Sequence, residues 1–223
     1  PSGEAAAARP HPRQREQLVH TRHKLGGPGR GLLISTALPD PAHWWKNQTW
    51  TRLQKHLPEW IVLRLEGYRP ALLALQDQIS QLASELEAAA PESIPVGLGK
   101  LTTVVLTREI CDWHRFHNRR TISSYTGLCP GERTSGSKRV PGSVTKRGNP
   151  RVRSTLVECA WRMVRFQPQY PPVAKRPGLL CKGSPATGAV RKKAIVAVAR
   201  HLADDLWRLH TVPCHPQQLG LNI

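Results

Sequence analysis

A regular spacing of large side chains between Ile61 and Leu86 constrains the fold of this chain more than any other feature. The residues that carry it are Ile61, Leu65, Tyr68, Leu72, Leu75, Ile79, Leu82 and Leu86, which are alternately four and three positions apart. This spacing places side chains on one face of an α-helix, as in the seam of a coiled coil. Pro70 follows Gly67 within the run, so we expect a kink or break there. The remaining faces are weakly acidic, so we expect the helix to contact protein: another helix of this chain or the same helix of a second copy.

The segment before this seam gives weaker signals. Residues 1–13 are rich in Ala, Pro and Arg without periodicity, and they predict a disordered arm. A short helix is expected over 14–24, ended by the Gly-Gly-Pro-Gly sequence at 26–29, because glycine and proline are the strongest helix breakers. Asp40-Pro41 is typical of a helix start, and Trp44 and Trp45 in the helix that follows are predicted to be core rather than a base-stacking platform.

Charge divides the chain more sharply than hydrophobicity does. The 223 residues carry a formal net charge of +18; residues 1–90 hold 11 basic and 8 acidic side chains, whereas residues 91–223 hold 22 and 7. So large an excess favours an anionic partner, and nucleic acid is the first candidate. Prolines at 91 and 95 close the seam helix and mark the predicted domain boundary.

Several other classes of protein are disfavoured. Five cysteines without a C-x-x-C pair indicate neither a disulfide framework nor a zinc ribbon, and they fit a reducing cytoplasm. Without an apolar stretch of about 18 residues or a hydrophobic signal core, membrane spanning and secretion are not expected.

The densest positive charge lies between residues 133 and 153, where glycines and hydroxyl side chains are interleaved with basic residues and there is no carboxylate. Such a loop can direct guanidinium groups and backbone N–H groups at phosphates. A solvated surface loop and a localisation tag are the alternatives. The residues predicted to contact DNA are Arg133, Lys138, Arg139, Lys146, Arg147, Arg151 and Arg153.

A second candidate for phosphate binding is the sequence Val-Gly-Leu-Gly-Lys at 96–100. It precedes an apolar helix expected to reach Ile110, so Gly97, Gly99 and Lys100 would lie at a helix N-terminus, as in a helix-hairpin-helix turn. A plain turn between two helices has the same pattern.

The remaining segments predict further helices. One is expected over 112–120, one after Asn149-Pro150 as N-cap and first-turn proline, and one over 186–209, with an irregular stretch over 168–185. The predicted fold class is therefore all-α: a helical and coiled-coil region followed by a compact basic helical domain.

Catalytic groups are sparse. The few carboxylates beyond residue 90 form no convincing two-metal cluster, and Cys111, His114 and His117 match no closed zinc module. Asp204, His201 and His210 lack the nucleophile elbow of a hydrolase triad. Ser135 lies amid the basic residues, where a hydroxyl could attack a DNA phosphate while cations stabilise charge on the phosphoryl oxygens. That reaction also needs a base or metal, which these residues do not reveal.

Several motifs together resemble a known family. They are Val96–Gly99, Trp113–Arg120, Ser124–Pro130, Thr134–Arg139, Val144–Pro150 and Leu156–Trp161. In this order they resemble the C-terminal domain of insertion-sequence 110/116/902 type transposases. The resemblance implies a recombinase of mobile elements, related to bridge-RNA-guided recombination. It also implies an N-terminal RuvC-like domain with an Asp-Glu-Asp-Asp metal site, a coiled-coil linker and a nucleophilic serine. Ser135 stands in Thr-Ser-Gly where family members usually show Ser-Ser-Gly.

Residues and resemblance together predict three segments: residues 1–13 are an arm, 14–90 a helical and coiled-coil linker, and 91–223 a DNA-binding domain with the serine. No cofactor is expected in this chain, because the RuvC-like domain that would bind Mg²⁺ is not recognisable before residue 60; the chain is thus expected to be a fragment or degenerate copy. The expected partners are DNA and a second copy of the chain bound through the coiled coil; a guide RNA is left open as a further partner. The expected location is the nucleoid in the cytoplasm.

Two alternatives remain for function: a non-catalytic DNA- or RNA-binding helical protein, and a coiled-coil oligomerisation module. For the nucleophile, Ser137 and Ser143 are the alternates to Ser135, with Thr134 a poorer one.

Overall fold

A computed structural model describes residues 3–37, 42–135, 138–181 and 183–223. The chain divides into two compact units: Ala7–Ala89, which we call the helical unit, and Pro1–Ala6 with Ala90–Ile223, which we call the basic unit. Most of the described residues are helical, and the sheet found among them is a single antiparallel pair of strands, so the predicted all-α class is confirmed.

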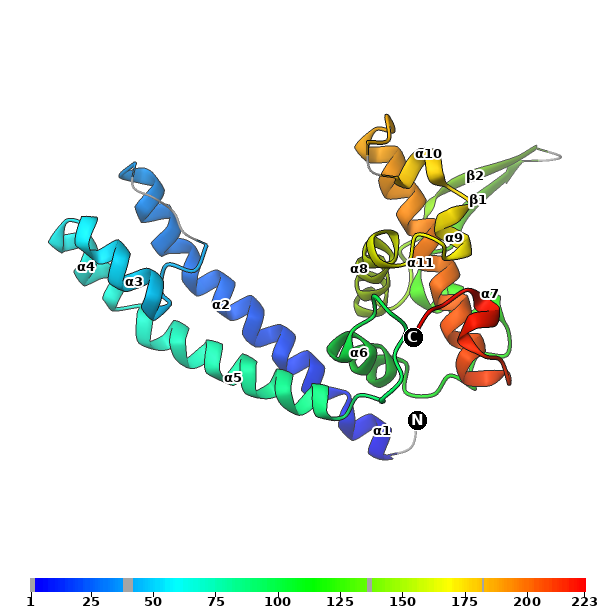
Figure 1. Ribbon diagram of the computed structural model, residues 1–223, viewed down its shortest axis with the longest axis horizontal. Coiled ribbons are helices and arrows are strands. Elements are labelled where there is room, and N and C mark those ends of the chain that lie inside the picture. The colour runs from blue at the N-terminus through cyan, green and yellow to red at the C-terminus, as the bar shows by residue number, and fades with distance from the viewer. Residues whose placement is uncertain (1–2, 38–41, 136–137, 182) are drawn as a thin grey trace. The chain divides into compact units, whose positions relative to one another are not determined.

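The helical unit is built on two long helices, α2 (Pro10–Ser35) and α5 (Arg69–Ala88), which lie side by side (Figure 1). Leu72, Ile79 and Leu86, seven positions apart, are the buried side chains of α5. The seam therefore packs within the chain, with α2 as its neighbour. The predicted break is confirmed, because α4 (Glu59–Glu66) ends before Gly67 and α5 begins at Arg69, with Pro70 in its first turn.

Two expectations for the N-terminal segment were wrong. Residues 3–8 form α1 (Gly3–Ala8) and α2 begins at Pro10, so a disordered arm over 1–13 is not what the described residues show. Alanines favour helix, and prolines at positions 10 and 12 fall in the first turn, where backbone N–H groups have no intrahelical partner.

The glycines at 26–29 do not end the helix either, because α2 continues to Ser35. Gly26 and Gly29 are buried against the rings of Trp45 and Trp44, and a Cβ on Gly29 would lie 2.4 Å from the Trp44 ring. Close packing of indole rings on the helix thus explains glycines that look like breakers in the sequence.

Trp44 and Trp45 lie in the core of the helical unit, as predicted. Trp44, Trp45 and Trp50 are at most 4% exposed and pack with Leu33 and Leu65. The helix that was expected to open at Asp40-Pro41 begins instead at Asn47, as α3 (Asn47–Leu53), followed by the 3₁₀ helix η1 (Gln54–His56). Asp40 and Pro41 themselves lie outside the described residues.

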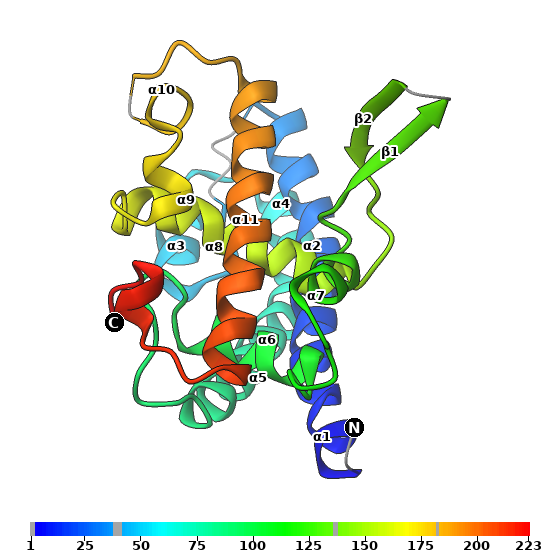
Figure 2. The same ribbon diagram turned by 90° about the vertical axis from the view of Figure 1, so that its right-hand side faces the viewer.

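In the basic unit, α11 (Gly188–Thr211) packs against α8 (Pro150–Phe166) and α7 (Arg119–Thr126), and α6 (Lys100–Ile110) packs against α8 (Figure 2). Apolar side chains of α11 and α8 form most of its core, including Val198, Leu202, Leu156 and Met163. The expected helix over 112–120 was wrong: Asn118 caps α7 through a capping box, so the helix starts only at Arg119.

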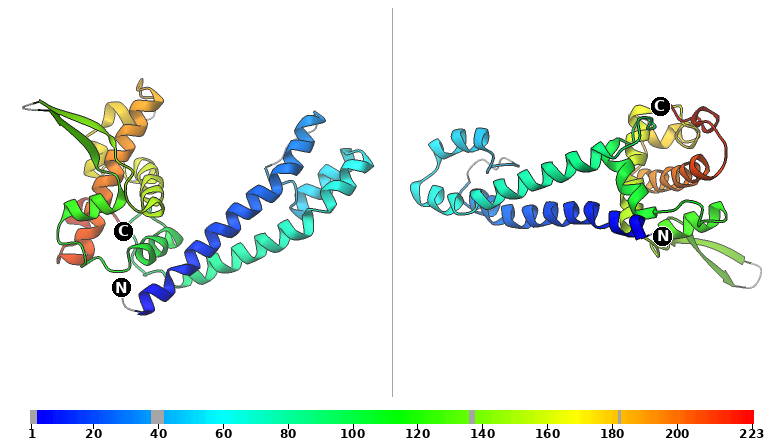
Figure 3. Two further views of the ribbon diagram at one scale, coloured as in Figure 1. Left: turned by 180° about the vertical axis from the view of Figure 1, so that it is seen from behind. Right: turned by 90° about the horizontal axis from the view of Figure 1, so that it is seen from below.

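The remaining elements of the basic unit are short. The helices α9 (Pro171–Ala174) and α10 (Pro177–Leu180) lie in the stretch predicted to be irregular, and η2 (Pro216–Leu219) follows α11. The strands β1 (Pro130–Ser135) and β2 (Lys138–Val144) form a hairpin that extends away from the helices in both views of Figure 3. Much of the predicted basic loop is therefore a hairpin, in which the loop's backbone groups pair with each other.

Candidate nucleic-acid interface

The basic hairpin places Ser135 next to its turn. Ser135 is the last residue of β1 and pairs with Lys138, the first residue of β2; Thr134 pairs with Arg139 and Arg133 with Val140. Ser143 lies near the other end of β2, five residues from Lys138, which is about 17 Å in a strand. Ser135 and Ser143 thus occupy opposite ends of the hairpin. Ser137 lies outside the described residues.

The base of the hairpin is fixed to the ends of two helices. Returning from β2, the backbone N–H of Thr145 donates to Cys129 O (3.0 Å), that of Lys146 to Gly127 O (3.1 Å), and that of Asn149 to Tyr125 O (2.8 Å). The Arg153 guanidinium donates to the Thr126 and Lys146 carbonyls at 3.3 and 3.0 Å. These bonds attach both strands to the C-terminus of α7 and the N-terminus of α8.

Gly148 is required at this junction. Its φ is +154°, and a Cβ would lie 2.4 Å from Tyr125 O and 2.6 Å from Gly127 N. Only glycine permits so close an approach of two backbones in this conformation. The lack of a side chain at residue 148 therefore allows the chain leaving the hairpin to enter α8.

A network of polar side chains also stabilises this junction between the hairpin and α8. Asn149 caps α8 by accepting from Arg151 N and Val152 N, and its Nδ2 donates to Glu109 Oε2 and to the Tyr125 hydroxyl, both at 3.0 Å. Glu109 is fully buried on α6, and Tyr125 donates to its backbone carbonyl at 3.1 Å. The Asn149-Pro150 pattern predicted the cap correctly. The spacing of the three residues in the sequence gave no sign of the network that joins them.

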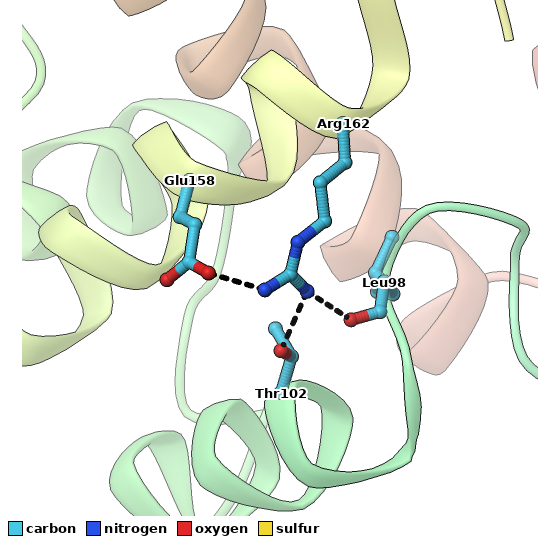
Figure 4. Close-up of polar contacts among 4 residues, drawn as sticks. All are labelled: Leu98, Thr102, Glu158 and Arg162. Atoms are coloured by element: carbon cyan, nitrogen blue, oxygen red, sulfur yellow. Dashed lines mark hydrogen bonds and ion pairs between the residues drawn. The ribbon is translucent and has the colours of Figure 1, made fainter. Parts of the chain in front are cut away.

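The glycine turn at 96–100 is held by an arginine of α8. Arg162 donates to Leu98 O (3.0 Å) and to Thr102 Oγ1 (3.1 Å), and it forms an ion pair with Glu158 (Figure 4). Gly97 and Gly99 have φ of +94° and +74°, which accounts for both glycines without a ligand. Lys100 is exposed at the first position of α6.

The structure brings together some of the predicted DNA-binding residues and separates others. Lys146 and Arg147 are exposed in the segment after β2, and Arg151 and Arg153 are half-buried in the first turn of α8. The glycine turn instead packs on Arg162, nine residues and about 14 Å further along α8. The other three predicted residues, Arg133, Lys138 and Arg139, lie in the paired strands of the hairpin.

The described part of the chain offers neither a candidate metal site nor a membrane-spanning helix. Within the described residues there is no group of three His, Cys, Asp or Glu side chains that could hold a metal ion. No helix in that part of the chain is long and apolar enough to cross a membrane.

The fold and this surface define a basic helical domain that presents an extended hairpin. Residues 91–173, which include the glycine turn, the hairpin and α8, match the Transposase IS116/IS110/IS902 family. This part of the chain is a transposase domain of that family.

Two relatives extend the similarity beyond this domain. One is y4rJ of Sinorhizobium fredii, which is named as a transposase and is 35% identical over 147 residues, 65% of this chain and 36% of that protein. The other, the transposase for insertion sequence element IS1111A of Coxiella burnetii, is 34% identical over 170 residues, 68% of this chain and 45% of that protein. The chain thus spans less than half the length of these relatives.

Proposed function

We propose that this chain is the DNA-handling part of a transposase, which binds DNA through the basic hairpin and the start of α8 and supplies Ser135 as the nucleophile for strand cleavage. The observation that carries the proposal is the family match over residues 91–173, which encloses a hairpin with Ser135 beside its turn. The similarity to the IS1111A transposase supports transposition as the process.

In this proposal the base of the hairpin and its far end have different roles. The hairpin base is fixed by hydrogen bonds to two helices. In this proposal Lys146 and Arg147 near the base contact phosphates, and Ser135 at the other end of the hairpin attacks the bond that is cleaved. In the cleavage step the Ser135 Oγ forms a bond to phosphorus while one bond from phosphorus to a deoxyribose oxygen breaks. The serine proton passes to a base or water, and the leaving oxygen takes up a proton.

Further parts of the proposal rest on the family resemblance. A divalent metal such as Mg²⁺ would be bound by a RuvC-like domain outside residues 1–223, a guide RNA would be a second ligand, and the protein would act at the nucleoid. A second copy would associate through the helical unit. Since the α5 seam packs on α2, self-association would use other side chains, such as Trp60 and Leu63, which are 51% and 65% exposed.

Trapping a covalent protein–DNA adduct tests the central claim. The complete transposase encoded at the locus of this chain would be incubated with a plasmid that carries the locus and its flanking DNA. We expect an adduct that maps by mass spectrometry to Ser135 and is lost in Ser135→Ala. DNA binding should stay nearly intact in that variant, since one hydroxyl contributes little beside many Lys and Arg contacts.

Matched variants at neighbouring hydroxyls identify the nucleophile. Thr134→Val, Ser137→Ala and Ser143→Ala should each keep the adduct. An adduct that survives Ser135→Ala would move the role to a neighbour. If every variant and the parent bind DNA but form no adduct, the alternative of a non-catalytic nucleic-acid-binding protein is correct. The oligomerisation module would be favoured if DNA binding is also absent and sedimentation shows a stable dimer.

A further inference from the structure

A groove lined by arginines lies at the other end of α7 from the hairpin. Its volume is about 570 Å³, and its basic lining comes from helices α7 and α11 and from the two-residue segment between α9 and α10. The arginines are Arg119, Arg120, Arg176, Arg200 and Arg208. No sequence pattern predicted the groove, because its arginines are spread over 90 positions and only the fold brings them together.

The α11 side of the groove is one helical face. Ala197, His201, Asp204 and Arg208 are spaced by four, three and four residues, so their side chains follow each other along the helix. Arg119 and Arg120, both exposed, face them from the first turn of α7. Two helices therefore form most of the groove, and the segment between α9 and α10 adds Arg176.

Positive charge in the groove exceeds negative charge. The lining holds five arginines against Asp204 and Asp205. Both carboxylates are already engaged by the fold: Ser123 Oγ donates to Asp204 (2.9 Å), and the Tyr170 hydroxyl donates to Asp205 (2.6 Å), which also pairs with Arg208 at 3.7 Å. Burial raises the pKa of both carboxyls, which reduces the negative charge that they carry at acidic pH.

The other arginines have few internal partners. Arg176 donates to the Pro172 carbonyl at 2.6 Å. Among the described residues, the guanidinium groups of Arg119, Arg120 and Arg200 form no ion pair with a carboxylate within 4.0 Å. Arg200 acts electrostatically on Asp204, but none of the three guanidinium groups is held in a close ion pair, so their N–H groups are available to an external anion.

We infer that this groove binds a phosphodiester backbone, as a second nucleic-acid contact of the basic unit beside the hairpin. Guanidinium groups bind phosphate oxygens through paired hydrogen bonds, and arginine retains its charge at any physiological pH. The described lining contains no Tyr, Phe or Trp, and its five arginines are suited to phosphate oxygens, so contacts to the backbone would hold the strand without reading its sequence. Duplex DNA and single-stranded RNA share this chemistry.

The groove lies close enough to the hairpin for both to contact the same nucleic acid. Helix α7 has 8 residues, about 12 Å, with Arg119 and Arg120 at its start and the hairpin base at its end. A strand held in the groove would therefore lie one short helix away from the hairpin base. The inference rests on the proposed function only in taking nucleic acid as the ligand; it does not need Ser135 to be a nucleophile.

Binding measurements on the full chain test the groove. The variant Arg119→Gln/Arg120→Gln/Arg200→Gln would be compared with Arg165→Gln/Lys192→Gln/Lys193→Gln, which removes the same charge from exposed positions outside the groove. We expect the groove variant to bind duplex DNA or single-stranded RNA about tenfold or more weakly than the control, with the salt slope for duplex DNA reduced by about 2–3, since each phosphate contact contributes about 0.9. Loss with DNA alone or with RNA alone identifies the source of the backbone.

A second measurement uses the unaltered chain and so does not depend on the variants folding. Phenylglyoxal modifies free guanidinium groups, and peptide mapping should show Arg119, Arg120 and Arg200 protected by the nucleic acid that binds. Equal binding by the groove and control variants, or unchanged modification of these arginines, would overturn the inference, as would an unaltered chain that binds neither nucleic acid. Groove-dependent binding without any serine adduct would leave the inference standing and refute the proposed cleavage.

Discussion

At the scale of single residues, Gly148 is the position where the structure makes the sharpest demand on the sequence. Gly148→Ala places a Cβ 2.4 Å from Tyr125 O in a backbone conformation that L-residues rarely adopt. We expect the free energy of unfolding of the basic unit to fall by about 2–3 kcal/mol, because two backbone segments must separate. Urea unfolding followed by Trp fluorescence measures the change.

Gly178→Ala is the matched control, because no atom lies within 4 Å of its added Cβ and its φ is not in the positive range. It should leave stability unchanged or raise it by up to about 1 kcal/mol. Equal losses in the two variants would show that the contact of Gly148 with the Tyr125 carbonyl is not what limits stability.

Asp204 gives a pH-dependent prediction. Burial raises the pKa of its carboxyl, although the Ser123 hydroxyl, Arg200 and His201 oppose the shift. An acid with a raised pKa in the folded state binds more protons than in the unfolded state, so its ionisation destabilises the fold as the pH rises above about 4. Asp204→Asn removes this effect while keeping an oxygen that accepts from Ser123. The stability of the variant relative to the parent should therefore increase with pH until the parent carboxyl is fully ionised.

Urea unfolding of both proteins at a series of pH values tests this. Taking the difference between the two proteins cancels the repulsion among the other charges. A difference that shrinks as the pH rises would mean that Asp204 is stabilised as a carboxylate, against the direction expected from its burial.

At the scale of elements, helix α2 depends on glycines that a sequence pattern interprets as breakers. Gly29→Ala would bring a Cβ to 2.4 Å from the Trp44 ring, whereas Gly31→Ala, two positions on in the same helix, meets nothing within 4 Å. We expect Gly29→Ala to destabilise the helical unit by about 1–3 kcal/mol through overpacking, and Gly31→Ala to stabilise it by up to about 1 kcal/mol through helix propensity. Thermal unfolding monitored by circular dichroism at 222 nm distinguishes the two. If both substitutions are stabilising, Trp44 can move away from α2 without loss.

The elements also show which kinds of sequence pattern are reliable. The break near Pro70 and the cap at Asn149-Pro150 were predicted correctly, because each depends on local backbone chemistry within a few residues. The hairpin was not predicted, because its pairing depends on hydrogen bonds between segments and each strand contains a Pro-Gly pair, which β-strands disfavour. The helix predicted over 14–24 was shorter than α2 for a similar reason. Trp44 and Trp45, which follow α2 in the sequence, pack against its glycines and stabilise the helix there.

At the scale of the whole molecule, the sequence showed that positive charge is concentrated beyond residue 90. It did not show how the charged side chains are arranged in space. Charge counts alone indicated that nucleic-acid binding belongs beyond residue 90. The seam at 61–86 gave the right faces of α5, but no pattern identified α2 as its neighbour. Neither the buried Glu109 network nor the arginine groove could be inferred, because each joins residues whose proximity arises only from the tertiary fold.

The concentration of charge leads to the last prediction, the salt dependence of DNA binding by the whole chain. If about six phosphates are neutralised, a plot of log affinity against log salt concentration should have a slope of about −5 for duplex DNA. Replacing Lys138, Arg139, Lys146 and Arg147 by Gln should flatten this slope by about 3–4, since each lost contact removes about 0.9. Replacing Arg52, Lys55, Lys192 and Lys193, which are exposed and lie outside the hairpin, changes the net charge equally and should alter the slope far less. Fluorescence anisotropy over a range of salt concentrations measures all three slopes. A slope that stays the same in the hairpin variant and flattens in the control would place the DNA contact away from the hairpin and its base.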